Sequence, residues 1–196
     1  MSRCDTHEFY EHTLNLYHEN AKRLRWNSRQ TQEIRFQMIR NYLPEDLSPF
    51  TLVDAGCGFG DFNSYILKHN DMLKHYRGLD LLPQIITEAQ SKNNYDFEVC
   101  NILCDPLPLS DFYICSGAMN TLTPFETHLF IRRCFEHSRK GFIFNLLEGE
   151  DSSLIYNYVD FKTIQNLAKE LHADFHYQRG YLDNDITVAF YKTECC

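Results

Sequence analysis

Three glycines at alternate positions mark the part of the sequence with the clearest chemical meaning. They stand in the stretch 53–60, which reads VDAGCGFG and lies between an apolar run from Phe50 and a helical pattern that begins at Asp61. Glycine lets the backbone approach a ligand closely and adopt dihedral angles that other residues avoid. A glycine turn between a strand and a helix opens a nucleotide-binding unit, so we expect a nucleotide-type ligand here.

The residue at the start of that helix separates two kinds of nucleotide ligand. The dinucleotide fingerprint has glycine at its first, third and sixth places, and the sixth place here is Asp61. A carboxylate at a helix N-terminus repels a pyrophosphate. The pattern therefore favours a cofactor without phosphates, and a nicotinamide-dependent oxidoreductase is the less favoured alternative.

The glycine stretch resembles the first motif of the class I S-adenosylmethionine-dependent methyltransferases, which has the form (V/L)D-x-G-C-G-x-G. The resemblance implies that Gly56, Cys57 and Gly58 pass along the methionine part and the ribose of the cofactor, with Asp54 shaping the turn beneath it. It also implies that Asp80, at the end of the second strand, accepts hydrogen bonds from both ribose hydroxyls. The expected cofactor is S-adenosylmethionine, and the expected product is S-adenosylhomocysteine.

Four further residues match positions where this family contacts its cofactor. Leu81 is expected against the adenine, with ordinary core packing as the alternative. Asn101 is expected to accept a hydrogen bond from the adenine amino group, and Ile102 to stack on the ring. The family often has Gly-Asp where this chain has Cys100-Asn101, and asparagine is also a common turn residue, so a turn role stays open. Ser116 follows the fourth strand, where family members face the sulfonium and the methyl acceptor.

The N-terminal arm supplies two more candidates for contact with the cofactor. The Trp26 ring is expected to cover the cofactor or stack on a cationic group, and Arg25 to pair with the methionine carboxylate. A helical lid whose aromatic residues are core explains the arm equally well. The chain is also similar to a group of uncharacterised bacterial methyltransferases, through Trp26-x-Ser28, Gln32, Arg35-Phe36 and Tyr181-Leu182-x-Asn184-Asp185.

The sequence assigns no catalytic residue. Methyl transfer from a sulfonium is an in-line displacement, so alignment of donor and acceptor in a dry pocket supplies most of the acceleration. A hydroxyl or protonated amine acceptor would also require a general base. The candidates for that base, each explained as well by a surface or packing role, are His7, Tyr10, His12, His18 and Asn120.

Alternating strand and helix patterns predict the frame that positions these residues. Strands are expected at 51–54, 76–80, 97–100, 112–115 and 141–147, with helices between them. Residues 123–126, which read TPFE, are a start signal for a helix that ends near Ser138. The tail alternates at 175–177 and 186–190, which predicts a terminal antiparallel hairpin.

These elements predict an α/β fold, a Rossmann-like three-layer sandwich. Its sheet is expected to be mostly parallel and seven-stranded, with a C-terminal antiparallel strand and an N-terminal helical lid. We expect a single domain over 1–196, with an arm over 1–44 and a Rossmann-like core over 50–196. The cofactor is expected across the carboxyl ends of the first and second strands.

Composition restricts the partners and the compartment. The chain has 196 residues, of which 43% are hydrophobic, so it can bury one sizeable core. Its net charge of −8 repels phosphate backbones, which disfavours nucleic acid as a partner. The start of the sequence lacks an apolar signal segment, and no run is long enough to span a membrane, so we expect a cytoplasmic protein. The cysteines are irregularly spaced, which predicts reduced thiols and no metal site.

The expected function is therefore a methyltransferase whose acceptor the sequence does not name. The acidic charge and the absence of an appended recognition domain favour a small-molecule acceptor, with a protein side chain as the second possibility. A protein that binds S-adenosylmethionine without transferring its methyl group is the alternative outside catalysis. The atom that is methylated and the oligomeric state are not indicated by the sequence.

Overall fold

The computed structural model describes residues 29–92, 94–149 and 156–193. The chain divides between Ile34 and Arg35 into two units. In the first unit, the described residues 29–34 are helical, and Arg29 Nε donates a hydrogen bond to Glu33 Oε1 at 3.4 Å. The second unit begins with the helical residues 35–41 and contains every element described below.

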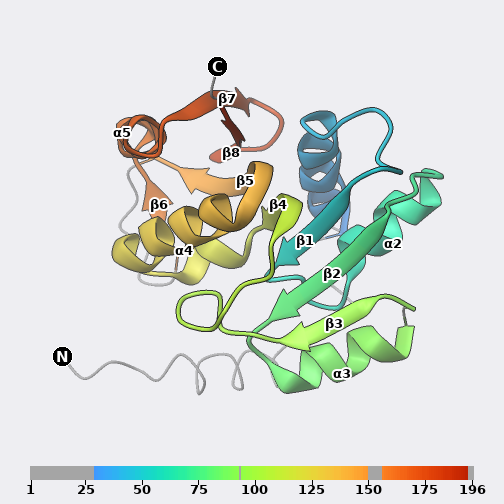
Figure 1. The fold of residues 1–196 in the computed structure, drawn as a ribbon. Helices are drawn as coiled ribbons and strands as arrows, with labels where there is room; N and C mark the ends of the chain where they lie inside the picture. The colour runs from blue at the N-terminus through green and yellow to red at the C-terminus, as the bar shows by residue number, and fades with distance from the viewer. Residues whose placement is uncertain (1–28, 93, 150–155, 194–196) are drawn as a thin grey trace. The chain divides into compact units, whose positions relative to one another are not determined.

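A mixed sheet of eight strands forms the centre of the second unit as far as it is described (Figure 1). The strand order is β3-β2-β1-β4-β5-β8-β7, and β6 also pairs with β5. Neighbours from β3 to β5 pair in parallel, whereas β8 pairs antiparallel with both β5 and β7. The strands are β1 (Thr51–Ala55), β2 (His75–Asp80), β3 (Asp96–Val99), β4 (Ser110–Ser116), β5 (Ser138–Glu148), β6 (Tyr158–Val159), β7 (Ala173–Arg179) and β8 (Asp185–Lys192).

The predicted fold class is confirmed, and the sheet differs from the prediction by one strand. We predicted seven strands, and the additional one is β6, which has two residues. It pairs in parallel with Leu147 and Glu148, beyond the point where β4 stops pairing with β5. Two residues are too few to carry an alternating pattern, so the sequence does not indicate this strand. The terminal hairpin was predicted and is formed by β7 and β8.

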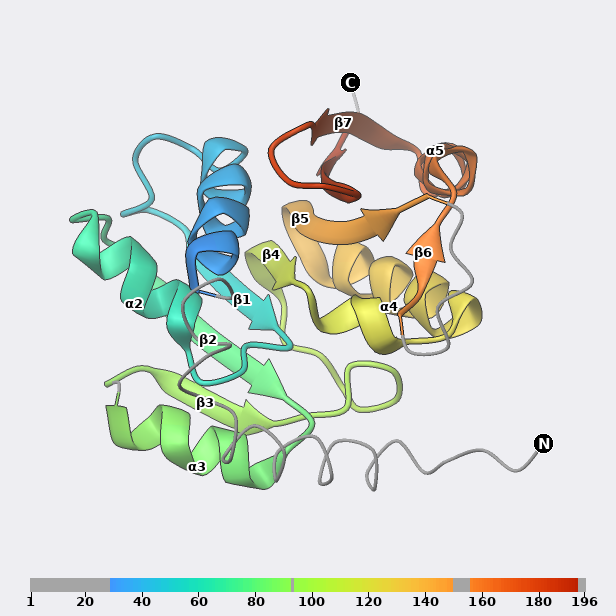
Figure 2. The same ribbon diagram turned by 180° about the vertical axis from the view of Figure 1, so that it is seen from behind.

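Helices cover both faces of the sheet (Figures 1 and 2). On one face lie the helical residues 35–41, α2 (Asp61–Lys68) and α3 (Pro83–Lys92); on the other lie α4 (Pro124–His137) and α5 (Phe161–Glu170). The predicted start of α4 is a complete capping box. Thr123 Oγ1 accepts a hydrogen bond from Glu126 N at 3.3 Å, and Glu126 Oε2 accepts one from Thr123 N at 2.9 Å.

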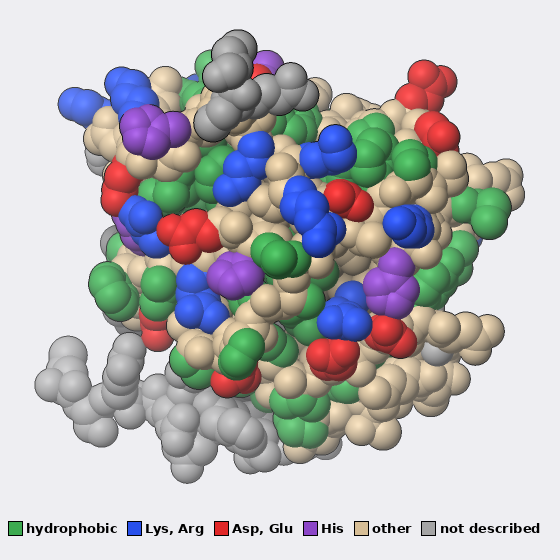
Figure 3. All heavy atoms as spheres, in the orientation of Figure 1, with side chains coloured by type: hydrophobic (Ala, Val, Ile, Leu, Met, Phe, Trp, Pro, Cys, Tyr) green, Lys and Arg blue, Asp and Glu red, His purple; other side chains and the backbone are tan. Residues whose placement is uncertain are grey.

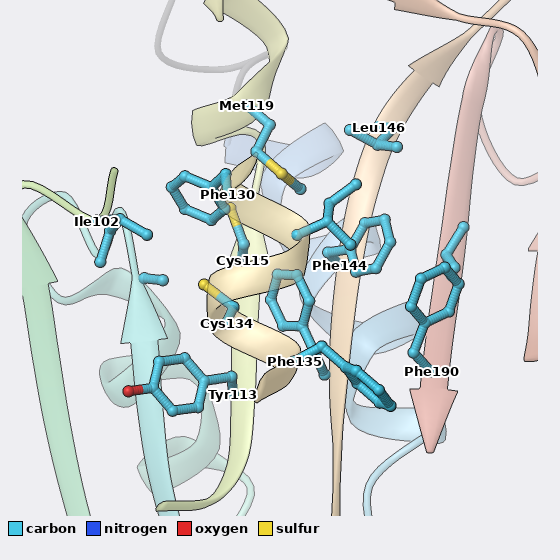
Figure 4. Packing of buried hydrophobic residues seen from close by; sticks show 14 of the residues in the cluster. Ile102, Tyr113, Cys115, Met119, Phe130, Cys134, Phe135, Phe144, Leu146 and Phe190 are labelled. Carbon is cyan, nitrogen blue, oxygen red and sulfur yellow. The ribbon is translucent and has the colours of Figure 1, made fainter. Parts of the chain in front are cut away.

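Each face of the sheet has its own apolar layer. Along β5, Phe144 packs toward α4 and Ile143 toward the opposite helices, as the two-residue period of a strand requires. Figure 4 shows the first layer, in which Cys115, Phe144 and Phe190 of neighbouring strands lie against Cys134 and Phe135 of α4. Of the cysteines that are described, all are free thiols, and only Cys104 is exposed.

Charged groups of both signs share the surface. Lysine and arginine side chains are interspersed with acidic ones on the face shown in Figure 3. Within the described ranges, no helix combines the length and the apolar composition that crossing a membrane requires.

Candidate cofactor site

The glycine loop after β1 is fastened to the end of β2. Gly56, Gly58 and Gly60 have φ angles of 77°, 55° and 78°, which lie in the left-handed region that favours glycine. The backbone N–H groups of Gly56 and Cys57 both donate to the carbonyl oxygen of Leu79, at 2.7 and 3.0 Å. The predicted sequence of strand, glycine turn and helix is therefore present, and α2 begins directly at Asp61.

Two glycines of this loop are needed for different reasons. A Cβ atom added to Gly56 would lie 2.3 Å from the Cβ of Ala118, so the absence of a side chain lets the loop pack against the 3₁₀ helix η1 (Ala118–Thr121). A Cβ atom added to Gly58 would meet no heavy atom of the described residues within 4 Å. Among these residues, Gly58 therefore borders open space, where a ligand can approach the backbone closely.

Asp80 lies at the end of β2, directly beside Gly58. Its Oδ2 accepts a hydrogen bond from Gly58 N at 3.1 Å, and its Oδ1 accepts one from Leu82 N at 3.1 Å. Burial raises the pKa of Asp80, and these backbone donors act in the opposite direction. Each carboxylate oxygen has a second lone pair, so Asp80 can still accept hydrogen bonds from a pair of ligand hydroxyls.

Asp54 lies beneath the loop and is 3% exposed. Tyr76 donates its hydroxyl proton to Asp54 Oδ2 at 2.7 Å. The pKa of Asp54 is raised to about 7, chiefly by burial; the Tyr76 hydrogen bond acts to lower it, and the Asp80 and Asp61 carboxylates contribute to the rise. The Asp80 and Asp61 carboxylates thus both act on Asp54, and this acidic edge of the sheet favours a ligand with positive charge over one with phosphates.

We predict that Asp54→Asn makes the protein more stable above neutral pH. The folded chain binds the Asp54 proton more tightly than the unfolded chain, so ionisation of Asp54 destabilises the fold as pH rises from about 4 to about 7. Asparagine keeps an oxygen for Tyr76 and cannot ionise. The gain at pH 8 is on the order of 2–4 kcal/mol. Urea unfolding of both proteins at pH 5 and pH 8 measures it, and an equal difference at the two pH values contradicts the prediction.

The other predicted cofactor contacts have different surroundings. Leu81 is 37% exposed, so the structure does not place it in the core. Asn101 Oδ1 accepts a hydrogen bond from Leu103 N at 3.0 Å, which is the turn role that the sequence left open. Ile102 is 5% exposed and packs in the core cluster on the α4 face. Cys57 is buried, and burial raises the pKa of its thiol, which therefore stays protonated.

The candidates from the N-terminal arm lie outside the described residues. These are Arg25 and Trp26 for the cofactor and His7, Tyr10, His12 and His18 for a general base. The last candidate base, Asn120, is 8% exposed within η1, and its side-chain oxygen has no hydrogen-bond partner among the described residues. An amide has no proton affinity suited to a base, so Asn120 has no support as one.

Ser116 contacts a group of polar residues that were not predicted from the sequence to belong to the site. Ser116 Oγ donates to Asn145 Oδ1 at 3.2 Å, and Asn145 also contacts Thr187 and Tyr181. Nearby on β8, Asp185 holds Arg35. The sequence offered one signal, since Arg35, Tyr181 and Asp185 belong to the segments that resemble bacterial methyltransferases, but it did not indicate that they meet.

Several solved structures with this architecture are described as methyltransferases. A magnesium protoporphyrin IX methyltransferase from Synechocystis with bound S-adenosylhomocysteine has a TM-score of 0.66 at 14% identity, over 88% of this chain and 86% of that chain. A methyltransferase from Thermotoga maritima, described as a possible histamine N-methyltransferase, has a TM-score of 0.69 at 13% identity, over 95% and 99%. A putative methyltransferase from Haloferax volcanii, solved with an activator protein, has a TM-score of 0.71 at 11% identity, over 90% and 96%.

These likenesses define the fold. The chain has the Rossmann-like fold of class I S-adenosylmethionine-dependent methyltransferases. No family model matches the sequence, and no curated protein is similar to it by sequence.

Proposed function

We propose that this protein binds S-adenosylmethionine at the glycine loop and Asp80 and transfers its methyl group to a small molecule. The observation that carries the proposal is the loop itself. Three left-handed glycines follow β1, Gly58 borders open space, and the Asp80 carboxylate from the neighbouring strand lies beside it. Neighbours with the same fold have been solved with S-adenosylmethionine or S-adenosylhomocysteine.

The residues at this edge fit that cofactor better than a dinucleotide. Asp54, Asp61 and Asp80 form an acidic group, and Asp61 occupies the first turn of α2, where a pyrophosphate would bind. The positive charges of a sulfonium and an ammonium group attract such carboxylates, whereas the negative charges of phosphates repel them. The exposed Leu81 side chain follows Asp80 directly and supplies an apolar surface for the adenine.

In this arrangement the chain contributes binding and alignment. When bound, S-adenosylmethionine supplies a methyl group whose bond to sulfur breaks as the bond to the acceptor forms, leaving the electron pair on sulfur. Asp80 fixes the ribose hydroxyls and Gly58 allows close approach of the backbone. Ser116 ends β4 and η1 packs against the glycine loop, and we assign to them the confinement of the acceptor.

Turnover tests the proposal against the non-catalytic alternative. S-adenosylmethionine is incubated with the purified protein and a set of small-molecule amines, phenols and carboxylic acids, and S-adenosylhomocysteine is measured. We expect its release only when an acceptor is present. Tight binding without release supports a protein that senses or sequesters the cofactor. If the protein binds a nicotinamide dinucleotide and not S-adenosylmethionine, the result contradicts the proposal and supports a nicotinamide-dependent oxidoreductase.

A further inference from the structure

A buried amide organises the polar residues at the ends of β5 and β8. Asn145 is 1% exposed. Its Nδ2 donates to Thr187 Oγ1 at 2.6 Å and to Tyr181 Oη at 3.3 Å, while its Oδ1 accepts from Ser116 Oγ at 3.2 Å. Both hydroxyl oxygens therefore act as acceptors toward the same amide.

The hydrogen bond between Thr187 and Tyr181 leaves the proton of Tyr181 unused. Thr187 Oγ1 accepts from Asn145 and donates its own proton to Tyr181 Oη at 2.8 Å. The Tyr181 oxygen thus receives two hydrogen bonds, and among the described residues its O–H has no acceptor. Burial raises the pKa of Tyr181 to about 12, so the phenol keeps this proton at neutral pH and can donate it.

A second unused donor lies next to Tyr181. Asp185 precedes Thr187 by two positions on β8, so their side chains lie on the same face of the strand. Asp185 is 4% exposed, and its two oxygens accept from Arg35 Nε at 2.9 Å and Arg35 Nη2 at 2.7 Å. This paired geometry fixes the guanidinium plane, and Arg35 Nη1 has no acceptor within the described part of the chain.

These donors lie at the same edge of the sheet as the cofactor loop. Ser116, the last residue of β4, is the register partner of Asn145, which lies three residues before the end of β5. Two residues after Ser116, Ala118 lies against Gly56 of the glycine loop. The Tyr181 and Arg35 donors are therefore next to the glycine loop, on the side of β5 and β8. An acceptor would have to lie on that side to meet the methyl group.

We infer that Tyr181 and Arg35 form a carboxylate-binding subsite for the methyl acceptor, an inference that rests on the proposed methyltransferase function. Both groups offer protons and neither offers a lone pair, so they match the oxygens of a carboxylate and not an ammonium group. Asp185 holds the guanidinium in place, and Asn145 with Thr187 holds the phenol. The acceptor is then a small carboxylic acid, such as an amino acid or an aromatic acid.

Acetate is the probe that tests the subsite, because it is small enough that shape does not decide its binding. The protein is labelled with ¹⁵N, and the backbone amide signals of Gly180 and Leu182, which flank Tyr181, are followed during titration with sodium acetate. Sodium chloride at equal ionic strength and ethylammonium chloride are the control titrations. We expect a saturable shift with acetate alone.

A variant and its control test whether the Tyr181 hydroxyl binds acetate. Tyr181→Phe removes only the hydroxyl and is expected to weaken acetate about tenfold, the effect of one hydrogen bond to a charged group. Tyr177→Phe, at a half-exposed tyrosine on β7, is the matched control and should bind acetate like the wild type. Thermal unfolding of each variant establishes that it is folded.

The titrations are run with and without S-adenosylhomocysteine, so that the two proposals fail separately. If acetate shifts the signals no more than chloride does, or if Tyr181→Phe binds it as tightly as the wild type, the carboxylate subsite is overturned. If S-adenosylhomocysteine does not bind while acetate does, the cofactor assignment is wrong. The carboxylate site then exists, but its proposed role in binding the methyl acceptor is contradicted.

Discussion

Asp80→Ala is expected to weaken the binding of S-adenosylmethionine and S-adenosylhomocysteine by about 100-fold or more. The carboxylate is proposed to accept hydrogen bonds from both ribose hydroxyls, and hydrogen bonds to charged groups contribute roughly 1.5–3 kcal/mol each. Loss of two such bonds corresponds to at least about two orders of magnitude in affinity. Calorimetric titration of both ligands into the wild type and the variant, after removal of any co-purifying ligand, measures the change.

Two further variants make this result specific. Glu98→Ala removes an exposed carboxylate from β3, the neighbouring strand, and should bind the ligands like the wild type. Asp80→Asn retains one oxygen acceptor and should fall between the wild type and Asp80→Ala. Since Asp80 also accepts hydrogen bonds from Gly58 N and Leu82 N, thermal unfolding must show that each variant is folded. Wild-type affinity in folded Asp80→Ala would remove Asp80 from the cofactor site.

The frame of the fold could be predicted because its signals are local. The alternating strands, the capping box at Thr123 and the glycine loop each depend on residues that are close in the sequence. β6 could not be predicted because its two residues pair only where β4 has ended. Its formation depends on the register of the whole sheet and not on its own sequence.

The candidate site divides in the same way. Gly58 and Asp80 were recognised from a motif, and their contact across 22 positions follows from the parallel pairing of β1 with β2. Arg35 and Asp185 are separated by 150 positions, and no periodic pattern connects them. Asn101 shows a further limit, because the same residue type suits a turn and an adenine contact. Its hydrogen bond from Leu103 N supports the turn role, and the adenine contact stays a prediction.

Gly56→Ala is expected to destabilise the fold by about 3 kcal/mol or more. Its φ of 77° strains any residue with a side chain, which costs roughly 1–2 kcal/mol. The new Cβ would also lie 2.3 Å from the Cβ of Ala118, so the glycine loop and η1 must separate. Urea unfolding at neutral pH measures the loss.

The double variant Gly56→Ala/Ala118→Gly separates the two causes. Removing the Ala118 methyl group relieves the contact but not the φ strain, so the double variant should recover about half of the loss, a coupling of roughly 1–2 kcal/mol. Gly58→Ala adds strain alone, because its Cβ would meet no heavy atom within 4 Å in the described part of the chain, and should cost only about 1 kcal/mol. The methyl group added to Gly58 also enters the space assigned to the cofactor. For each kcal/mol of stability lost, Gly58→Ala should therefore weaken S-adenosylhomocysteine binding more than Gly56→Ala does. If Gly58→Ala binds the ligand normally, that space is not the cofactor site; if the double variant shows no recovery, the loop does not depend on its contact with η1.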